Sequence, residues 1–281
     1  MLGIGTVSAF DLGFLSPKQE FKIATTTSLD DTGLLTALEE KFESEHSDVD
    51  VQFISAGTGK ALEYGEKGDV DLVMVHSKAK EKEFIDAGYG TNRTIFAYNF
   101  FYLVGPKDDS AGINGSDVVA AFGKIADEGA KNPDKVKFVS RGDESGTHNR
   151  ELKIWNETGL DYNSTISGQK WYLESGKGMG ETLIMSNEKQ AYTLSDSGTY
   201  LAFAGNTTLV PYITEGKDLM NVYSLIPINA TKFPDTKSDI GQEWITFVTG
   251  AEGQGIIKDY GVDKYGKTLF TPYVGTSDPE V

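Results

Sequence analysis

The sequence predicts an α/β protein of two lobes, for three reasons. After residue 20, short apolar segments typical of buried strands alternate with amphipathic segments typical of helices, the pattern of a mostly parallel sheet covered by helices. The alternation falls into two sets, one before about residue 105 and one from about 115 to 205. Apolar strands at 99–104 and 222–228 can carry the chain between the sets. Two sets joined by two crossing strands favour two lobes with a cleft between them.

The first set contains strands that run into short polar turns. Residues 21–28 read as a strand that ends in Thr-Thr-Thr-Ser, and a helix with Leu34, Leu35, Leu38 and Phe42 on one face follows. Residues 51–59 form a second strand that ends in Ser-Ala-Gly-Thr-Gly before another helix. A buried strand at 70–75 and the first crossing strand complete this set.

The second set repeats the alternation and is followed by the return crossing. Pro227 lies in the returning strand and suits an edge or a crossing rather than a central position. An amphipathic helix over 240–260 ends the pattern, with Trp244 and Phe247 on its apolar stripe. The elements expected in the second set are a helix at 116–129, a strand at 135–140, a helix at 146–158, a Gly-rich turn at 176–180, a helix from 181, a strand at 191–195 and a helix from 196.

The composition narrows the possible functions. A net charge of −16 argues against a nucleic-acid partner, whose phosphates require a basic face. The chain has no cysteine, so disulfides, zinc–thiolate sites and a lipidated N-terminal cysteine are excluded. No apolar stretch approaches the roughly 20 residues of a membrane span. Residues 1–19 are expected to be a disordered leader or the remnant of an export signal, and six Asn-X-Ser/Thr sequons fit an exported protein.

Three of the strand–turn–helix segments predict a pocket for a small oxyanion. Each turn places hydroxyls and free backbone N–H groups at a helix N-terminus, where an anion is attracted. An arginine directly after an apolar strand can bind an oxyanion in bidentate fashion. The candidate ligand-binding residues are Thr26, Thr27 and Ser28 from the first turn, Ser55, Gly57 and Thr58 from the second, and Arg141, Ser145, Gly146 and Thr147 from the third.

Several residues in these segments also admit other interpretations. Asp143 and Glu144 are expected to cap the following helix or to orient Arg141 rather than to touch the ligand. Ser145 and His148 could suggest a serine hydrolase, but no carboxylate partner and no Gly-X-Ser-X-Gly elbow accompany them. His76 is expected to be a structural or hinge-lining histidine. We therefore expect a binding protein rather than an enzyme, with no cofactor and no bound metal cation.

Together these segments resemble the tungstate-binding proteins of ABC uptake systems, which are periplasmic-type solute-binding proteins. The Thr-Thr-Thr-Ser string is typical of the tungstate group, whereas Arg-X-X-X-Ser-Gly-Thr is shared more broadly with phosphate binders. The matching strings lie at 24–33, 56–59, 71–76, 140–148, 178–180 and 192–201.

The resemblance implies a periplasmic binding protein type II-like fold, with mixed, mostly parallel sheets joined by a two-strand hinge. Lobe 1 would comprise residues 20–103 plus 224–275, and lobe 2 residues 104–223. The resemblance also implies an extracytoplasmic location and a permease and an ATPase as membrane partners, and we expect a monomer.

The protonation state of the anion near neutral pH predicts which anion the site prefers. Hydrogen phosphate benefits from a carboxylate acceptor, which would repel a fully ionised anion such as tungstate or molybdate. Because the acidic pairs at 30–31 and 143–144 are expected to face helix caps, we predict tungstate or molybdate and rejection of phosphate. The alternatives are another tetrahedral oxyanion (phosphate or sulfate), an anion-sensing module, or a hydrolase.

Overall fold

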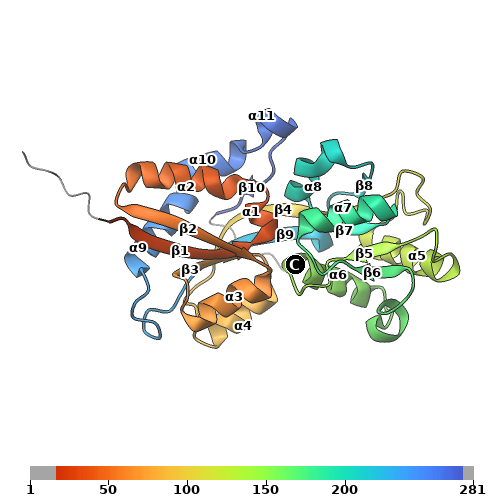
Figure 1. Ribbon diagram of the computed structural model, residues 1–281, viewed down its shortest axis with the longest axis horizontal. Coiled ribbons are helices and arrows are strands. Elements are labelled where there is room, and N and C mark those ends of the chain that lie inside the picture. Colours follow the sequence, from red (N-terminus) through yellow and green to blue (C-terminus); the bar gives the residue numbers. More distant parts are fainter. Residues whose placement is uncertain (1–16, 275–281) are drawn as a thin grey trace, which may run out of the picture.

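The computed structural model describes residues 17–274 and consists of two lobes side by side (Figure 1). The predicted leader at 1–19 therefore falls almost entirely outside the described residues. Two long strands, β4 (Thr94–Gly105) and β9 (Met220–Pro227), run between the lobes. Within 17–274, no helix is both long enough and apolar enough to cross a membrane.

Lobe 1 is built on a mixed sheet with the strand order β10-β4-β9-β3-β1-β2. Strands β1, β2 and β3 pair in parallel, as the alternation of strands and helices predicted. The other elements of this lobe are helices. Their bounds, with those of the strands, are β1 (Gln19–Thr26), α1 (Thr27–Asp30), α2 (Leu34–Glu45), β2 (Val49–Ala56), α3 (Thr58–Lys67), β3 (Leu72–Val75), α4 (Lys78–Asp86), α9 (Ser238–Thr249), α10 (Ala251–Asp259), α11 (Val262–Tyr265) and β10 (Thr271–Pro272).

Side chains alternate between two cores on the two faces of this sheet. Phe21 and Ile23 pack with Trp244 in one core, while Ala24 belongs to the other core. Because successive strand residues point to opposite faces, each parallel strand needs apolar side chains on both sides. Helices α2, α9 and α10 contribute to the first core, and α3 and α4 contribute to the second, so the two groups cover opposite faces of the sheet.

Lobe 2 has its own core, which is rich in aromatic residues. Trp155 stacks edge-on against Phe138, and Phe122 lies 4.5 Å from Trp155 between ring centroids. Strands β5 and β6 pair in parallel, and a parallel bridge joins Phe138 to Tyr192 at the start of the next strand. The elements are α5 (Val118–Lys131), β5 (Phe138–Ser140), α6 (Gly146–Glu157), η1 (Tyr162–Ile166), β6 (Tyr172–Glu174), α7 (Met179–Lys189), β7 (Thr193–Asp196), α8 (Ser197–Phe203), η2 (Ala204–Asn206), β8 (Val210–Ile213) and η3 (Lys217–Leu219).

The crossing strands account for the antiparallel part of the structure. β4 pairs with β9 from Thr94 to Phe100 and then, from Phe101, with β7 of lobe 2. Each antiparallel strand pairing in the described part of the chain involves β4 or β9. Parallel pairing is thus confined to the interior of each lobe. The predicted lobe boundaries at 103/104 and 223/224 fall within these two strands.

One predicted element was wrong in its extent. The amphipathic segment 240–260 is two helices, α9 and α10, rather than one, and they meet at Gly250. The backbone of Gly250 is extended (φ −78°, ψ 173°), which ends the helical geometry of α9. A new helix direction allows Glu252 of α10 to reach Lys41 of α2 at 2.7 Å.

Candidate functional site

The turn after β1 places hydroxyl groups at the boundary between the lobes. Thr26 and Ser28 are buried, and their hydroxyl oxygens lie 3.3 Å apart. The Ser28 hydroxyl also lies 3.2 Å from Nε2 of His76, which follows the neighbouring strand β3. Thr27 begins the short helix α1 and is half-buried. Three of the predicted site residues therefore gather at the carboxyl end of β1.

The turn after β2 faces lobe 2 through its backbone. A Cβ atom added to Gly57 would lie 3.6 Å from the carbonyl oxygen of Asp143 and 3.9 Å from Cα of Ser145. Thr58 is fully buried at the N-terminus of α3, and its hydroxyl has no partner within the part of the chain described here. Ser55 differs from these two residues because it is exposed.

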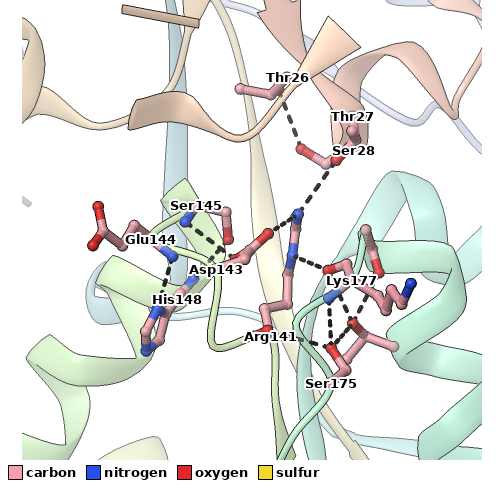
Figure 2. Close-up of polar contacts among 12 residues, drawn as sticks. Thr26, Thr27, Ser28, Arg141, Asp143, Glu144, Ser145, His148, Ser175 and Lys177 are labelled. Atoms are coloured by element: carbon pink, nitrogen blue, oxygen red, sulfur yellow. Dashed lines mark hydrogen bonds and ion pairs between the residues drawn. The ribbon is translucent and has the colours of Figure 1, made fainter. Parts of the chain in front are cut away.

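Arg141 is the cation of the site, and it reaches from lobe 2 toward lobe 1 (Figure 2). It follows β5 and is 3% exposed. Its Nη2 lies 3.4 Å from the hydroxyl of Thr27, and its Nε donates to the carbonyl of Lys177 at 3.3 Å. The guanidinium is thereby held at the lobe boundary beside the hydroxyls of the first turn.

Asp143 pairs with this arginine. One carboxylate oxygen accepts from Arg141 Nη2 at 2.5 Å, and the other accepts from the backbone N–H of Ser145 at 3.2 Å. Asp143 thus contacts both Arg141 and the N-terminus of α6, the two places that the sequence predicted for it, to orient the arginine or to cap the helix. The carboxylate occupies donors of the kind that an oxyanion uses, a charged guanidinium and an N–H at a helix N-terminus.

Backbone conformation shapes the loop between Arg141 and α6. Gly142 has φ 60° and Glu144 has φ 58°, a region that residues other than glycine rarely adopt. A side chain at Gly142 would also collide with Glu174, at 2.9 Å from its Cβ. These conformations make a tight turn between Arg141 and α6, so that the N-terminus of α6 lies beside the arginine.

The first residues of α6 are buried. Ser145 is the N-cap, and its hydroxyl accepts from the backbone N–H of His148 at 3.2 Å. Thr147 is 1% exposed, and its hydroxyl has no partner among the described residues. His148 accepts at Nδ1 from the backbone N–H of Glu144. The Ser145 hydroxyl is thus paired with backbone rather than with the imidazole, which does not fit a nucleophile and its base.

Gly146 of lobe 2 lies tightly against His76 of lobe 1. A Cβ atom at Gly146 would lie 2.4 Å from Cε1 of His76, so glycine alone fits against the ring. Tyr223 packs on the same imidazole, with ring centroids 4.8 Å apart. Burial lowers the pKa of His76 to about 3, so the ring is neutral near pH 7. His76 lines the lobe boundary, as expected from its place in the sequence.

Two further helices of lobe 2, α7 and α8, begin at the same boundary, and their N-terminal residues are not among those predicted for the site. Gly178 caps α7, and a Cβ there would lie 3.9 Å from the Thr27 hydroxyl. Asp196 caps α8 and accepts from the N–H and hydroxyl of Thr199. Burial raises the pKa of Asp196 to about 6. Both belong to strand–turn–helix segments like the three that were selected, so this pattern was the available signal.

The donors that the site brings together suit the binding of an anion. Helices α1, α3, α6, α7 and α8 all begin at the lobe boundary and direct their N-termini toward it. Among residues 17–274 there is no cluster of His, Asp and Glu that could hold a metal ion. The donors are hydroxyls, backbone N–H groups and one arginine, which together can surround a desolvated oxyanion.

Comparison with known proteins identifies the family of this chain. Residues 16–252 match the model of the PBP superfamily domain. A Haloferax volcanii protein, whose name assigns it to anion binding for an ABC transporter, is 43% identical over 93% of this chain and 74% of its own length. The tungstate-binding protein TupA of Peptoclostridium acidaminophilum is 39% identical over 89% of this chain and 84% of its own.

A solved structure shares the same architecture. The tungstate ABC transporter structure from Geobacter sulfurreducens is 43% identical, covers 87% of this chain and all of its own, and superposes with a TM-score of 0.76. At this level of identity and coverage, the likeness extends over both lobes and the strands that join them. The chain belongs to the PBP superfamily and, within it, to the family of the tungstate-binding protein TupA.

Proposed function

We propose that this protein is the extracytoplasmic solute-binding component of an ABC transporter and that it captures tungstate between its lobes. The observation that carries the proposal is the approach of Arg141 to Thr27, since Nη2 of one lobe lies 3.4 Å from the hydroxyl of the other. Residues 114 positions apart in the chain thus converge where several helix N-termini meet. The names of the relatives identify tungstate as the anion to test first.

The proposed event is capture without covalent chemistry. The anion first contacts the donors of one lobe, and closure then brings the donors of the other lobe around it. Since the complete donor set exists only in the closed form, the anion shifts the hinge equilibrium toward closure. The contacts of lobe 1 come from Thr26, Thr27, Ser28 and Thr58 with the N–H groups near Gly57, and those of lobe 2 come from Arg141, Ser145, Gly146 and Thr147. Ser55 is a weaker candidate because its side chain is exposed.

Arg141 supplies the formal positive charge, and the helix N-termini supply the rest. A dianion that faces one arginine retains an excess negative charge, which charge-assisted hydrogen bonds and helix dipoles offset. Asp143 shares the arginine, so tungstate binding requires that Arg141 divide its donors between the carboxylate and the anion or that Asp143 move aside.

The same contact favours one competing ligand. A carboxylate next to the anion accepts the proton of hydrogen phosphate but repels a fully ionised oxyanion. The place of Asp143 against Arg141 therefore gives phosphate a specific argument as the second candidate. Occupation of both carboxylate oxygens by donors of this chain favours tungstate, because a carboxylate that is already paired is a poorer acceptor for the ligand's proton.

The experiment is a calorimetric titration with tungstate, molybdate, sulfate and phosphate. We expect tungstate or molybdate to bind most tightly, with one anion per chain. Tighter binding of phosphate than of tungstate would refute the selectivity, and no binding of any of the four would refute the function. We propose further that the protein acts as a monomer without a cofactor, delivers the anion to a membrane permease powered by an ATPase, and catalyses no reaction.

A further inference from the structure

A cavity adjoins the proposed site at the contact between His76 and Gly146. It has a volume of about 200 Å³, and its lining includes these two residues together with Lys78, Arg93, Arg150 and Lys153. Among the described residues that line it, none is acidic. We call it the basic cavity. A hollow lined, in the described part of the chain, by four cationic side chains and no acidic one contrasts with the net charge of −16 of the whole chain.

The cations of the basic cavity differ in how far they are neutralised. Arg93 pairs with the buried carboxylate of Glu81. Arg150 donates instead to two backbone carbonyls, those of Asp218 and Met220, at 3.1 and 3.0 Å. Carbonyl oxygens satisfy its N–H groups, and the nearby carboxylates of Asp218 and Glu157 act on its charge without forming an ion pair with it. Lys153 lies 3.9 Å from Glu157 and its side chain is 44% exposed. The ion pair between Lys153 and Glu157 is therefore weak and is screened by solvent and salt.

The basic cavity and the proposed site share two residues from opposite lobes, His76 and Gly146. His76 lies 3.2 Å from Ser28 in the proposed site through Nε2, while its buried Nδ1 has no partner within the described chain. Gly146 approaches the same ring from lobe 2. When the lobes separate, this contact opens, and the basic cavity and the proposed site become one continuous space.

The negative net charge of the protein gives the basic cavity a role in attracting anions. An incoming dianion meets a repulsive field over most of this acidic surface, and a local basic hollow focuses the attraction. A volume of 200 Å³ corresponds to the liquid volume of roughly six water molecules, enough for a small anion with part of its hydration shell.

We propose that the basic cavity is an antechamber that receives the oxyanion before it enters the site between the lobes. This rests on the proposed function, because the anion that passes through is the one the site retains. Lys153 and Arg150 attract the anion there, and the parting of His76 from Gly146 admits it to Arg141.

The test is the association rate of tungstate, measured by stopped-flow fluorescence of the three tryptophans in Lys153→Glu. Lys131→Glu is the matched control, because Lys131 is also an exposed lysine on a lobe 2 helix with a glutamate partner one turn away, at 2.8 Å. Both variants change the net charge equally. We expect Lys153→Glu to bind about threefold to tenfold more slowly than the control at low salt, with the ratio approaching one near 1 M salt.

A third variant tests the opposite change. Asn149→Lys adds a cation to the lining of the basic cavity and should speed association relative to wild type. Equal association rates for Lys153→Glu and Lys131→Glu at low salt, while wild type still binds tungstate in calorimetry, would overturn the antechamber and leave the proposed function intact. Absence of tungstate binding by wild type would overturn both.

Discussion

Replacement of Arg141 by alanine should weaken tungstate binding about 30-fold to 1,000-fold. Arg141 is almost fully buried and touches the hydroxyl turn of the opposite lobe. Truncation of one partner of a buried, hydrogen-bonded charge pair costs about 2–4 kcal/mol or more, and each 1.4 kcal/mol corresponds to about a tenfold change in affinity. In this protein the loss should fall toward the upper end of that range, because Asp143 would remain beside the anion without its counterion.

Two control variants separate the loss of attraction between Arg141 and the anion from the repulsion between Asp143 and the anion. Asp143→Asn keeps a hydrogen-bonding group of the same shape without the negative charge, and it should bind tungstate at least as tightly as wild type. The double variant with Arg141→Ala and Asp143→Asn should recover part of the affinity lost in Arg141→Ala. Isothermal titration calorimetry measures the affinities, and thermal unfolding without ligand checks that each variant is folded. A loss under tenfold in folded Arg141→Ala would place Arg141 outside direct contact with the anion and refute the reasoning.

Three more predictions follow from the lobe boundary. Gly146→Ala should weaken tungstate binding at least tenfold, because the added Cβ would lie 2.4 Å from the His76 ring and obstruct closure. Gly123→Ala, where nothing lies within 4 Å, is the control, and equal affinities of the two variants would contradict the closure argument. The pKa of His76 is about 3 in the folded protein and about 6.5 in the unfolded chain. As pH falls from 6.5 toward 3, the unfolded chain binds a proton that the folded protein does not, so wild type should lose up to about 1.4 kcal/mol of stability per pH unit relative to His76→Gln. Parallel pH profiles from urea unfolding would contradict this assignment. Finally, tungstate at about a thousandfold above its Kd should raise the free energy of unfolding by about 4 kcal/mol, visible as a higher Tm. An unchanged Tm at saturation would contradict preferential binding to the folded state.

The local features of the fold could be predicted from the sequence. The turn after Ala24 combines β-branched strand residues with a helix entered through hydroxyls, and both preferences arise within a few residues. The extent of the last amphipathic segment could not be predicted in this way. Its apolar stripe continues past Gly250, but α10 turns to pack on α2 through contacts far apart in the chain, such as that between Lys41 and Glu252. A periodic pattern records which face is buried, not where a tertiary contact bends the axis.

The same limit explains what was found and missed in the candidate site. Arg141 and Ser28 could be selected from the sequence because each lies in a short segment in which an apolar strand is followed directly by polar residues and a helix. Gly178 and Asp196 approach lobe 1 only after the two lobes have docked, since Gly178 meets Thr27 and Gly198, next to the Asp196 cap, meets Thr32. The exposure of Ser55 likewise depends on the direction in which its strand presents that position. Such positions depend on the arrangement of whole lobes and are not encoded in a short motif.

The link through β4 and β9 limits the motions open to this protein. Side chains reinforce that link near the end where β4 leaves β9 for β7, since the side-chain amide of Asn221 donates to the side-chain carbonyl oxygen of Asn99 at 2.9 Å. A ladder of two paired strands bends and twists more readily than it stretches, so the lobes swing along an arc rather than slide apart. A larger tetrahedral anion would stop the closure of the lobes at a wider angle than a smaller one. The angle between the lobes in the closed form would then depend on the size of the bound ion, and a membrane complex that receives the protein could distinguish ions by this angle.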